Sequence, residues 1–323
     1  MKGNTDLHTA RQRGADEFYT AYDDVSKEIS FYPGAFKDKR VFLPCDDWTR
    51  SNIYKFFKDN FNSLGLRLLI AQHISIETTN SHWLLYDGLN ELIFDTAEND
   101  NGDFRGQTAA RHFELCDVVV TNPPFSLFRE FMDLLNFYNK EYIVFGNINA
   151  VTYKEVFPGI VSGRVMLGPS VRSGDREFLV PKWYQLSGTA CRLDEETNEK
   201  FIRVKGVRWF TNMHPKNINV NMTELTQVYS PSLYQKFDTY DAINVNSIKE
   251  IPYDYDGKMG VPITALDKMD ADRTLAFKTD TGDIVRYRVI GMLNSGGRPE
   301  FYDFAKPIIN AKCKFKRIII IKV

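Results

Sequence analysis

Short apolar runs alternate with amphipathic helical patterns through the first half of the chain, and no other feature constrains its fold as much. Four runs have the length of a buried strand: residues 40–45, 66–71, 117–121 and 142–145. After the first run, apolar side chains from Ile53 to Phe61 recur at helical spacing, and Gly65 stands where a helix C-cap belongs. Ser126 can cap the helix after the third run. The pattern predicts right-handed βαβ units, a parallel sheet, and ligand-binding loops at the carboxyl ends of its strands.

The sequence pattern changes after about residue 160. Glycines separate shorter segments there, and residues 207–211 and 286–292 have strand patterns. A chain of 323 residues is long enough for two domains. We therefore predict an α/β domain over residues 1–215 and an α+β or β-rich module over residues 216–323.

Composition excludes several classes of protein. With 43% hydrophobic and 26% charged residues, the chain is neither disordered nor fibrous. No apolar run approaches the roughly 20 residues of a membrane span, and the first residues lack the apolar core of a secretory signal. The four cysteines form no CxxC pair and the five histidines lack metal-ligand spacing. We expect no disulfide framework, no metal, no membrane contact and a cytoplasmic location.

Asn122-Pro123-Pro124-Phe125 directly follows the third apolar run and carries the sharpest chemical signal. Asn122 supplies an amide oxygen, and the prolines form a rigid turn that can direct the Pro123 carbonyl toward the same point. Two such acceptors can take both N–H hydrogens of an exocyclic ring amine, which returns its delocalised lone pair to the nitrogen. The turn therefore predicts methyl transfer from a sulfonium to the amino group of a base.

Phe125 completes this candidate catalytic turn, because its ring offers a face on which the target base can stack. Stacking of a base on an aromatic side chain contributes about 1–3 kcal/mol. A base within a duplex cannot reach such a turn, so the target must be flipped out of the helix.

The loop Cys45-Asp46-Asp47 follows the first predicted strand, where a nucleoside cofactor usually lies in an α/β sheet. Its carboxylates can hold the cationic amino group of a methionine moiety or ribose hydroxyls. An alternative interpretation is that they only cap the next helix and interact with its dipole.

Two further stretches are candidates for holding the cofactor. Asp103 and Phe104 lie before the third strand; the carboxylate can accept from the amino group of an adenine ring, and the phenyl ring can pack on its face. The same stretch could instead be a surface turn. Near the N-terminus, Tyr19 and Thr20 could close over the methionine end, or mark the start of a helix.

Taken together, these stretches resemble the EcoRI-type adenine-specific DNA methyltransferase family over about residues 16–323. Their order along the chain is similar to that of the gamma group of amino methyltransferases. The stretches that carry the resemblance are DEFYT (16–20), VFLPCDD (41–47), GDFR (102–105), DVVVTNPPFSLFREF (117–131), GNINAVTYKEVFP (146–158), WFTN (209–212) and DAINVNSIKEIPYDYDGKMGVPIT (241–264).

The resemblance implies a Rossmann-like sheet and methyl transfer from S-adenosylmethionine to N6 of a flipped-out adenine in double-stranded DNA. It implies that residues 1–215 form the methyltransferase catalytic domain and residues 216–323 the target-recognition region. A cognate restriction endonuclease in the same system is the implied partner. The implied cofactor-binding residues are Phe18, Tyr19, Thr20, Asp46, Asp47, Asp103 and Phe104, and the implied catalytic residues are Asn122, Pro123, Pro124 and Phe125.

The chain departs from the family pattern at two points. The cofactor loop is Cys-Asp-Asp rather than glycine-rich. No acidic residue ends the second predicted strand, which leaves Glu77 and Asp87 as candidates for the ribose-binding carboxylate.

The C-terminal part of the chain is basic although the whole chain has a net charge of −1. Residues 256–323 contain 13 Lys and Arg against 8 Asp and Glu. Near the end, basic residues from Lys312 to Arg317 alternate with apolar ones. These cations can face phosphate groups, or they can guard an edge strand against pairing.

Two other functions remain open from the residues alone. The same turn chemistry would serve an amino methyltransferase that acts on cytosine N4, RNA or a protein glutamine. Alternatively, the chain could be a non-catalytic DNA-binding protein on the same fold.

Overall fold

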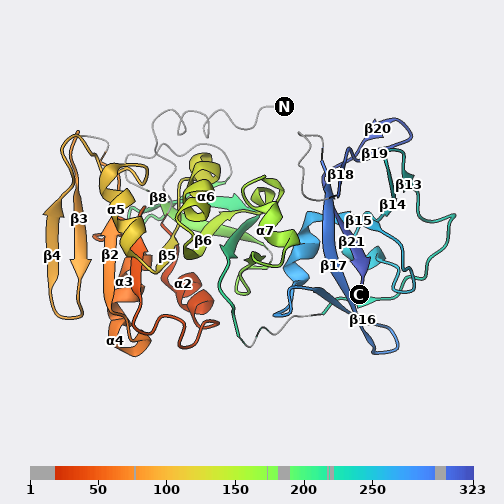
Figure 1. Ribbon diagram of the computed structural model, residues 1–323, viewed down its shortest axis with the longest axis horizontal. Coiled ribbons are helices and arrows are strands. Elements are labelled where there is room, and N and C mark those ends of the chain that lie inside the picture. Colours follow the sequence, from red (N-terminus) through yellow and green to blue (C-terminus); the bar gives the residue numbers. More distant parts are fainter. Residues whose placement is uncertain are drawn as a thin grey trace. The chain divides into compact units, whose positions relative to one another are not determined.

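The computed structural model describes residues 19–75, 78–172, 174–180, 190–216, 218, 222–294 and 303–323. The chain divides into two compact units (Figure 1), which are described separately. Unit 1 comprises residues 1–147 and 168–215, and unit 2 comprises residues 148–167 and 216–323. The predicted boundary at residue 215 coincides with the end of unit 1, whereas residues 148–167, which we placed in the first domain, pack with unit 2.

A mixed sheet with parallel strands at its centre organises unit 1, in the order β4-β3-β2-β1-β5-β6-β11. Strands β1, β2, β5 and β6 are mutually parallel, while β3 and β11 run antiparallel to the strands they join. The α/β architecture with a parallel sheet is therefore confirmed at this level. The strands are β1 (Arg40–Leu43), β2 (Leu68–Gln72), β3 (His82–Tyr86), β4 (Glu91–Asp95), β5 (Val118–Thr121), β6 (Glu141–Asn147) and β11 (Val207–Thr211).

Helices cover this sheet because their apolar stripes match its buried faces. The helices of unit 1 are α2 (Tyr22–Ile29), α3 (Asn52–Asp59), α4 (Phe61–Leu64), α5 (Gln107–Leu115), the 3₁₀ turn η1 (Phe125–Leu127) and α6 (Phe128–Phe137). Ser51 caps α3, its hydroxyl accepting from the backbone N–H groups of Ile53 and Tyr54 at 3.1 and 3.2 Å. Gly65 ends α4 with φ at 68°, as its position in the sequence predicted.

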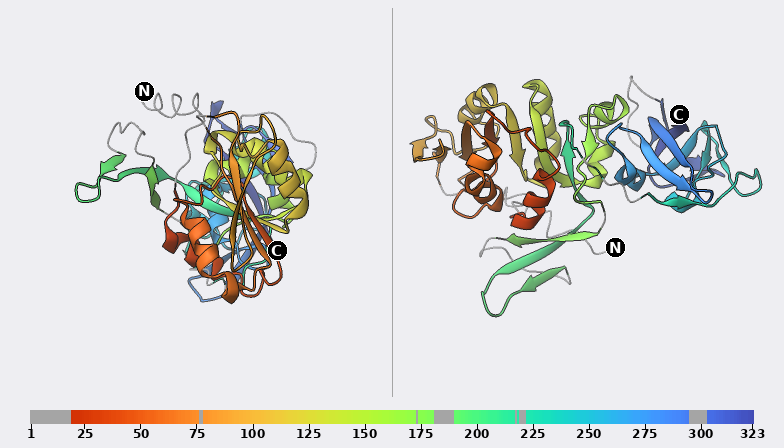
Figure 2. Two further views of the ribbon diagram at one scale, coloured as in Figure 1. Left: turned by 90° about the vertical axis from the view of Figure 1, so that its left-hand side faces the viewer. Right: turned by 90° about the horizontal axis from the view of Figure 1, so that it is seen from below.

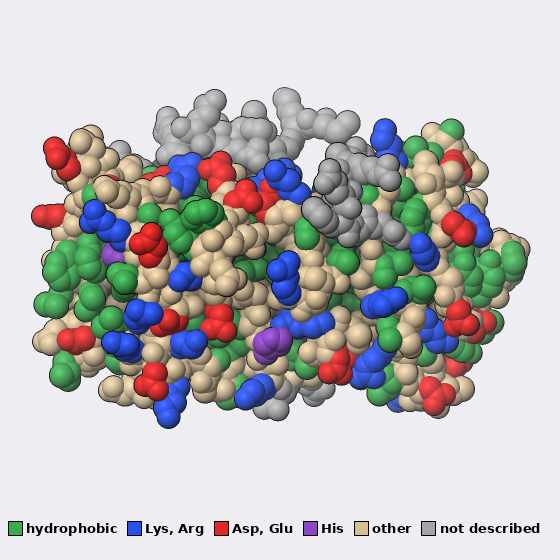
Figure 3. Space-filling view, viewed as in Figure 1, with side chains coloured by type: hydrophobic (Ala, Val, Ile, Leu, Met, Phe, Trp, Pro, Cys, Tyr) green, Lys and Arg blue, Asp and Glu red, His purple; other side chains and the backbone are tan. Residues whose placement is uncertain are grey.

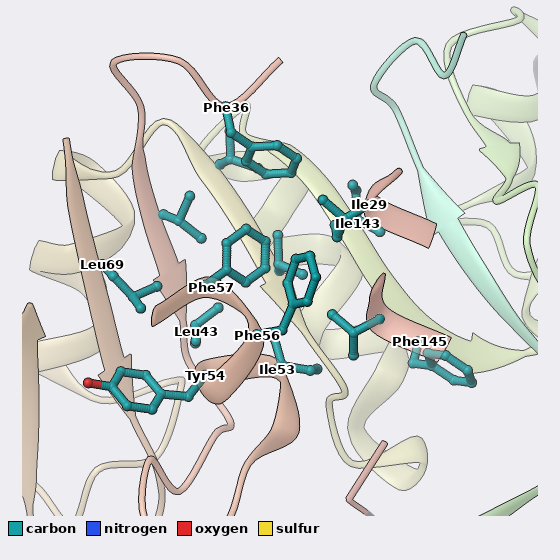
Figure 4. Packing of buried hydrophobic residues seen from close by; sticks show 14 of the residues in the cluster. Ile29, Phe36, Leu43, Ile53, Tyr54, Phe56, Phe57, Leu69, Ile143 and Phe145 are labelled. Atoms are coloured by element: carbon teal, nitrogen blue, oxygen red, sulfur yellow. The ribbon is translucent and has the colours of Figure 1, made fainter. Parts of the chain in front are cut away.

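The core of unit 1 lies between α2, α3 and the central strands. Figure 4 shows Phe56 and Phe57 of α3 among side chains of β1, β2 and β6. Phe57 and Leu43 are fully buried. Because each such side chain contributes about 1.5–3 kcal/mol when buried, this contact fixes α3 on the sheet. At the amino ends of β1 and β5, Arg40 and Asp117 form a bidentate ion pair (2.9 and 3.0 Å) that joins the two strands.

The prediction that Ser126 caps the helix after β5 is wrong. Residue Ser126 lies inside η1, and the N-cap position of α6 is Leu127, without a side-chain cap. The diproline turn is the physical reason: Pro124 is held near φ −53° and its carbonyl accepts from the Leu127 N–H at 3.0 Å. A tight backbone turn thus takes the place of a capping hydroxyl.

Two antiparallel additions to unit 1 were not predicted from the sequence. Strands β3 and β4 form a hairpin at one edge of the sheet, and all five residues of β4 are exposed. Figure 3 shows the hydrophobic side chains gathered over that edge. A separate sheet in the order β8-β10-β9, distinct in Figure 2, consists of β8 (Asp175–Val180), β9 (Cys191–Leu193) and β10 (Lys200–Lys205).

Unit 2 is rich in strands, within the range of the predicted α+β or β-rich module. Its main sheet has the order β12-β16-β17-β21-β15-β14-β13, with β18 on β17. A two-stranded sheet, β19-β20, is separate. The elements are η2 (Ile148–Thr152), α7 (Phe157–Val161), β7 (Met166–Leu167), β12 (Glu224–Leu225), β13 (Lys236–Phe237), β14 (Tyr240–Asn244), η3 (Ile248–Glu250), β15 (Met259–Pro262), η4 (Ile263–Lys268), β16 (Leu275–Thr279), β17 (Ile284–Leu293), β18 (Asp303–Ala305), β19 (Ile308–Ile309), β20 (Lys312–Cys313) and β21 (Arg317–Lys322).

Candidate active site

Asn122 is the first residue after β5, at the carboxyl edge of the parallel strands. Its side chain is buried, and its amide N–H donates to the Thr20 hydroxyl at 3.2 Å. The Thr20 carbonyl in turn accepts from the Asn52 amide at 2.9 Å, at the start of α3. Because the Thr20 hydroxyl accepts a hydrogen bond from the amide N–H group, the Asn122 side chain is held in one orientation. Its amide oxygen is the group that can accept a hydrogen bond.

Pro123 and Pro124 are both buried, and their carbonyl groups differ in whether they accept a hydrogen bond. The Pro124 carbonyl accepts from the Leu127 N–H, as described above. The Pro123 carbonyl accepts no hydrogen bond from the described part of the chain. Phe125 is half-buried and packs against the core of unit 1, so its ring is held in place with part of its surface exposed.

Asp46 links the loop after β1 to the loop after β5. Its carboxylate is 5% exposed and accepts from the Ser51 hydroxyl at 2.5 Å and from the Thr121 hydroxyl at 2.6 Å. Burial raises the pKa of Asp46 to about 6, although both hydroxyl hydrogen bonds act against that rise. Thr121 immediately precedes Asn122, so this carboxylate holds the end of the strand that presents the asparagine.

Asp47 has a different environment from Asp46. It is half-buried, and one oxygen accepts from the backbone N–H and hydroxyl of Thr49 at 2.9 and 2.6 Å. Its backbone carbonyl accepts from the Ser51 N–H at 2.7 Å, at the start of α3. The alternative interpretation, in which the carboxylates cap the next helix, is wrong, because the capping side chain of α3 is Ser51. The cofactor-binding role of Asp46 and Asp47 stays a prediction.

The loop that contains Asp103 and Phe104 is built around glycine and an internal ion pair. Gly102 has φ at 84°, and a Cβ there would overlap the carbonyl oxygen of His73. Burial alone would raise the pKa of Asp103, but the hydrogen bonds and charge of Arg105 lower it. The contacts from Arg105 to the carboxylate are 2.7–2.9 Å long. Phe104 is buried edge-to-face against Phe131, with ring centroids 5.1 Å apart.

Three of these loops line one pocket at the carboxyl edge of the sheet. Cys45 comes from the loop after β1, Asp103 and Phe104 from the loop before α5, and Pro124 from the loop after β5. The walls are mainly apolar, and the main polar groups are the Asp103–Arg105 pair. Such a lining suits a flat heterocyclic ring with a small number of polar contacts.

A larger cleft of about 710 Å³ is lined by Tyr19 and Ala21, the neighbours of Thr20 in the sequence. It is bounded by Tyr19, by Asn52 at the start of α3, and by Leu179 and Phe201 of the β8–β10 sheet. The backbone N–H of Tyr19 donates to the Leu179 carbonyl at 3.0 Å. The segment before α2 therefore forms a wall of the cleft while Thr20 holds Asn122.

Of the predicted residues, Phe18 and Glu77 lie outside the described residues, and Asp87 does not join this site. Asp87 lies in the β3–β4 turn, where its carboxylate accepts from the N–H groups of Leu89 and Asn90. Because β3 is antiparallel to β2, this turn is at the opposite edge of the sheet, which excludes Asp87 as a ribose ligand.

The sequence did not predict the residues whose hydrogen bonds position the candidate site residues. Thr121 and Ser51 hold Asp46 of the candidate cofactor loop by side-chain hydrogen bonds, Asn52 holds Thr20, and Arg105 forms an ion pair with Asp103. All four residues are polar, which was the signal that the sequence offered, but the partners of Asn52 and Thr121 lie 32 and 75 residues away along the chain. No group of three His, Cys, Asp or Glu suited to a metal occurs within the described ranges, and none of the helices described there is long and apolar enough to span a membrane.

A parallel sheet whose strand-end loops combine an asparagine–diproline turn, carboxylates and an apolar pocket is the arrangement expected of an S-adenosylmethionine-dependent methyltransferase that acts on amino groups. Over residues 6–323 the chain matches the family described as adenine-specific methyltransferase EcoRI. The chain belongs to the EcoRI adenine-specific methyltransferase family: it is an adenine-specific DNA methyltransferase, and S-adenosylmethionine is its methyl donor.

Similar proteins extend over most of the chain. The type II methyltransferase M.EcoRI of Escherichia coli is 38% identical over 331 residues, covering 97% of this chain and 95% of the relative. The type II methyltransferase M.MgeORF184P of Mycoplasma genitalium is 32% identical and covers 98% of both chains. M.MpnI of Mycoplasma pneumoniae is 36% identical over 80% of this chain and 81% of its own. No solved structure matches the chain significantly.

Proposed function

We propose that this chain is a Rossmann-like methyltransferase that modifies N6 of an adenine flipped out of double-stranded DNA, with residues 122–125 as its catalytic turn. One observation carries the proposal: the Asn122 amide is fixed by Thr20 at the end of β5, and Asp46 ties that same strand end to the cofactor loop. The acceptor for the amine and the candidate cofactor loop thus share one rigid scaffold.

We assign the pocket between Cys45, Phe104 and Pro124 to the adenine ring of the methyl donor, on the chemistry of its lining. Its apolar walls can enclose a ring, and Asp103 supplies an acceptor for an exocyclic amino group. Asp47, half-buried in the loop after β1, is suited to the cationic amino group of the methionine part. When bound, S-adenosylmethionine supplies a methyl group carried on a sulfonium.

The catalytic turn prepares the target amine. The Asn122 amide oxygen and the Pro123 carbonyl accept its two N–H hydrogens, so that the nitrogen lone pair leaves the ring system and becomes nucleophilic. Phe125 stacks on the flipped base. Fixed positions for the amine and the donor account for much of the rate, since correct orientation alone can supply effective molarities of about 10⁵–10⁸ M. The surplus proton leaves to water after transfer.

We assign the remaining parts of the molecule on the same basis. Unit 1 is the catalytic part, unit 2 is the target-recognition region, and the cleft beside Thr20 admits the flipped adenine. The named relatives are type II methyltransferases. By analogy, a restriction endonuclease that cuts the same site is the proposed partner in this system.

Transfer of labelled methyl groups to duplex DNA, followed by digestion to nucleosides, tests this function. We expect the label in N6-methyladenine. Label in N4-methylcytosine, or only in RNA or protein, would contradict the proposed substrate. Binding of duplex DNA without any label would indicate the non-catalytic alternative. A single-stranded oligonucleotide of the same sequence serves as the control for the duplex requirement.

A further inference from the structure

Residues 306–317 form a basic hairpin on unit 2 that none of the functions assigned above requires. Strands β19 and β20 pair through Ile308 with Cys313 and Ile309 with Lys312, and Asn310 and Ala311 form the turn with φ at 51° and 60°. Positive φ at both turn residues is the signature of a tight two-residue hairpin.

The hairpin is anchored at its base. Ile309 is 2% exposed and belongs to the core cluster of unit 2. The Asp238 carboxylate accepts from the Ala311 N–H at 3.0 Å, and the Ile308 carbonyl accepts from the Asp238 N–H at 2.8 Å. These contacts fix the position of the turn, and therefore that of the residues that directly follow it.

The exposed side of the hairpin is strongly cationic. Five of its residues are Lys or Arg and none is Asp or Glu. Lys306, Lys312 and Lys314 are exposed, and their ammonium groups have no ion pair or hydrogen bond with any residue that the structure describes. Lys312 lies on β20, in the two-stranded sheet that is separate from the main sheet, and Lys306 and Lys314 lie outside the strands, so these lysines do not guard an edge of the main sheet.

Arg317 is a second, independent sign of an anionic partner. It is 7% exposed, and its Nη1 donates only to the backbone carbonyls of Phe315 and Lys316, at 3.4 and 3.2 Å. Its Nε is buried without a partner, and it forms no ion pair within the described part of the chain. A buried guanidinium without a carboxylate is costly, and an anion that approaches the hairpin would offset that cost.

Phe315 projects from the middle of this basic segment. Its side chain is 86% exposed, although phenylalanine is usually among the most buried residues. Its neighbours in sequence are Lys314 and Lys316, and the Lys316 ammonium donates to the Thr152 hydroxyl at 3.0 Å, within unit 2. The lysine thus helps to fix the loop that carries the ring.

We propose that residues 306–317 are a DNA-binding element of the target-recognition region, in which Lys312 and Lys314 bind backbone phosphates and Phe315 inserts between base steps. This inference rests on the proposed duplex DNA substrate. Lysines on either side of an apolar wedge match the arrangement in which phosphate contacts position a protein and an inserted side chain unstacks the duplex. Insertion would also lower the cost of flipping a neighbouring base.

Binding of a fluorescent duplex of mixed sequence at several salt concentrations tests the proposal, with the full-length protein. K312Q/K314Q should reduce the slope of log K against log salt by about 2, because two phosphate contacts are lost. Phe315→Ala should weaken binding by about 5- to 150-fold and leave that slope unchanged, and Phe315→Leu should restore part of the loss. Melting temperature and S-adenosylmethionine affinity should stay at wild-type values.

The matched control is K249Q/K278Q, which removes two exposed lysines from the same unit. Lys278 lies on β16, at the opposite end of the unit from β19 and β20 in Figure 1. If the hairpin variants bind duplex DNA with the same affinity and slope as this control, the inference is overturned. The same holds if they lose binding to vesicles of anionic phospholipid instead of DNA. Failure of the wild-type protein to bind or methylate duplex DNA would instead overturn the proposed function.

Discussion

The side chains of Asp46, Thr121 and Asn122 form a continuous link from the candidate cofactor loop to the candidate catalytic turn. Asp46 accepts from Thr121, and Thr121 is bonded through the backbone to Asn122. Thr20 fixes the far end of the link. Each of these side chains is 6% exposed or less. Buried hydrogen bonds of this kind hold geometry tightly, because an unsatisfied partner would cost about 1–3 kcal/mol.

Replacement of Asn122 by alanine should remove most of the turnover and leave cofactor binding within a few fold. In the proposed mechanism the amide oxygen accepts from the target amine, so its loss should resemble the removal of one transition-state hydrogen bond, which costs about 10²–10³ in rate. Single-turnover methylation and equilibrium binding of S-adenosylmethionine measure the two effects. Asn62→Ala, at an exposed site of α4, is the control. An equal loss of cofactor affinity and rate in Asn122→Ala would contradict the assigned role.

Replacement of Asp46 by asparagine should remove a pH dependence of stability. The folded pKa of about 6 exceeds the unfolded value near 3.8. The folded state therefore holds the proton more tightly, and wild-type stability falls as pH rises from about 4 to about 6, by up to about 3 kcal/mol. Denaturant unfolding at pH 4 and pH 7 should show that the asparagine variant lacks this decline. A variant with the same pH profile as the wild type would show that folding does not raise the pKa of Asp46.

At the scale of the elements, the loops at the carboxyl edge depend on special backbone positions as much as on side chains. Gly102 directly precedes Asp103 and Phe104, which line the pocket. The Asp100 carboxylate accepts from the N–H groups of Gly102 and Thr108, at 2.9 and 2.7 Å, and so joins this loop to the start of α5. These hydrogen bonds within the protein hold the conformation of the pocket wall.

A methyl group at Gly102 should weaken binding of S-adenosylmethionine by about tenfold or more, because the loop must move to relieve the overlap with the His73 carbonyl. Gly34→Ala is the control, since Gly34 also has positive φ but has no atom within 4 Å of the added methyl group. Calorimetric titration should show reduced affinity for Gly102→Ala only. Equal affinities in both variants would mean that this loop does not bind the cofactor.

At the scale of the whole molecule, the chain consists of two compact units with separate cores. The candidate cofactor residues and the catalytic turn all belong to unit 1, whereas the basic hairpin belongs to unit 2. Each ligand should therefore act first on the unit that binds it.

Hydrogen exchange can follow the two units separately. S-adenosylmethionine at about 100 times its Kd should stabilise the state that binds it by about 2.7 kcal/mol. Exchange should then slow in β1 and β5 of unit 1, while β17 and β21 of unit 2 keep their rates. The reference states are the protein without ligand and the protein with S-adenosylhomocysteine. Uniform slowing across both units would show that they open as one cooperative body.

The sequence by itself determined the family, the methyl donor, the parallel strands and the turn after β5. These follow from local signals: apolar runs of strand length, helical spacing such as Ile53 to Phe61, and a short motif directly after a strand. The contiguous stretch that singled out Asp103 and Phe104 lines the pocket, and their role in binding the cofactor stays a prediction. Each of these signals is contained within a small number of neighbouring residues.

Only the tertiary structure decided how those stretches meet. The links from Asp46 to Thr121 and from Asn122 to Thr20 join residues 75 and 102 positions apart, and no local pattern encodes such a pairing. The antiparallel direction of β3 removed Asp87 from the cofactor edge. The diproline turn replaced the expected Ser126 cap with a 3₁₀ turn. In each case the deciding interaction is a hydrogen bond or strand pairing whose geometry exists only in the folded chain.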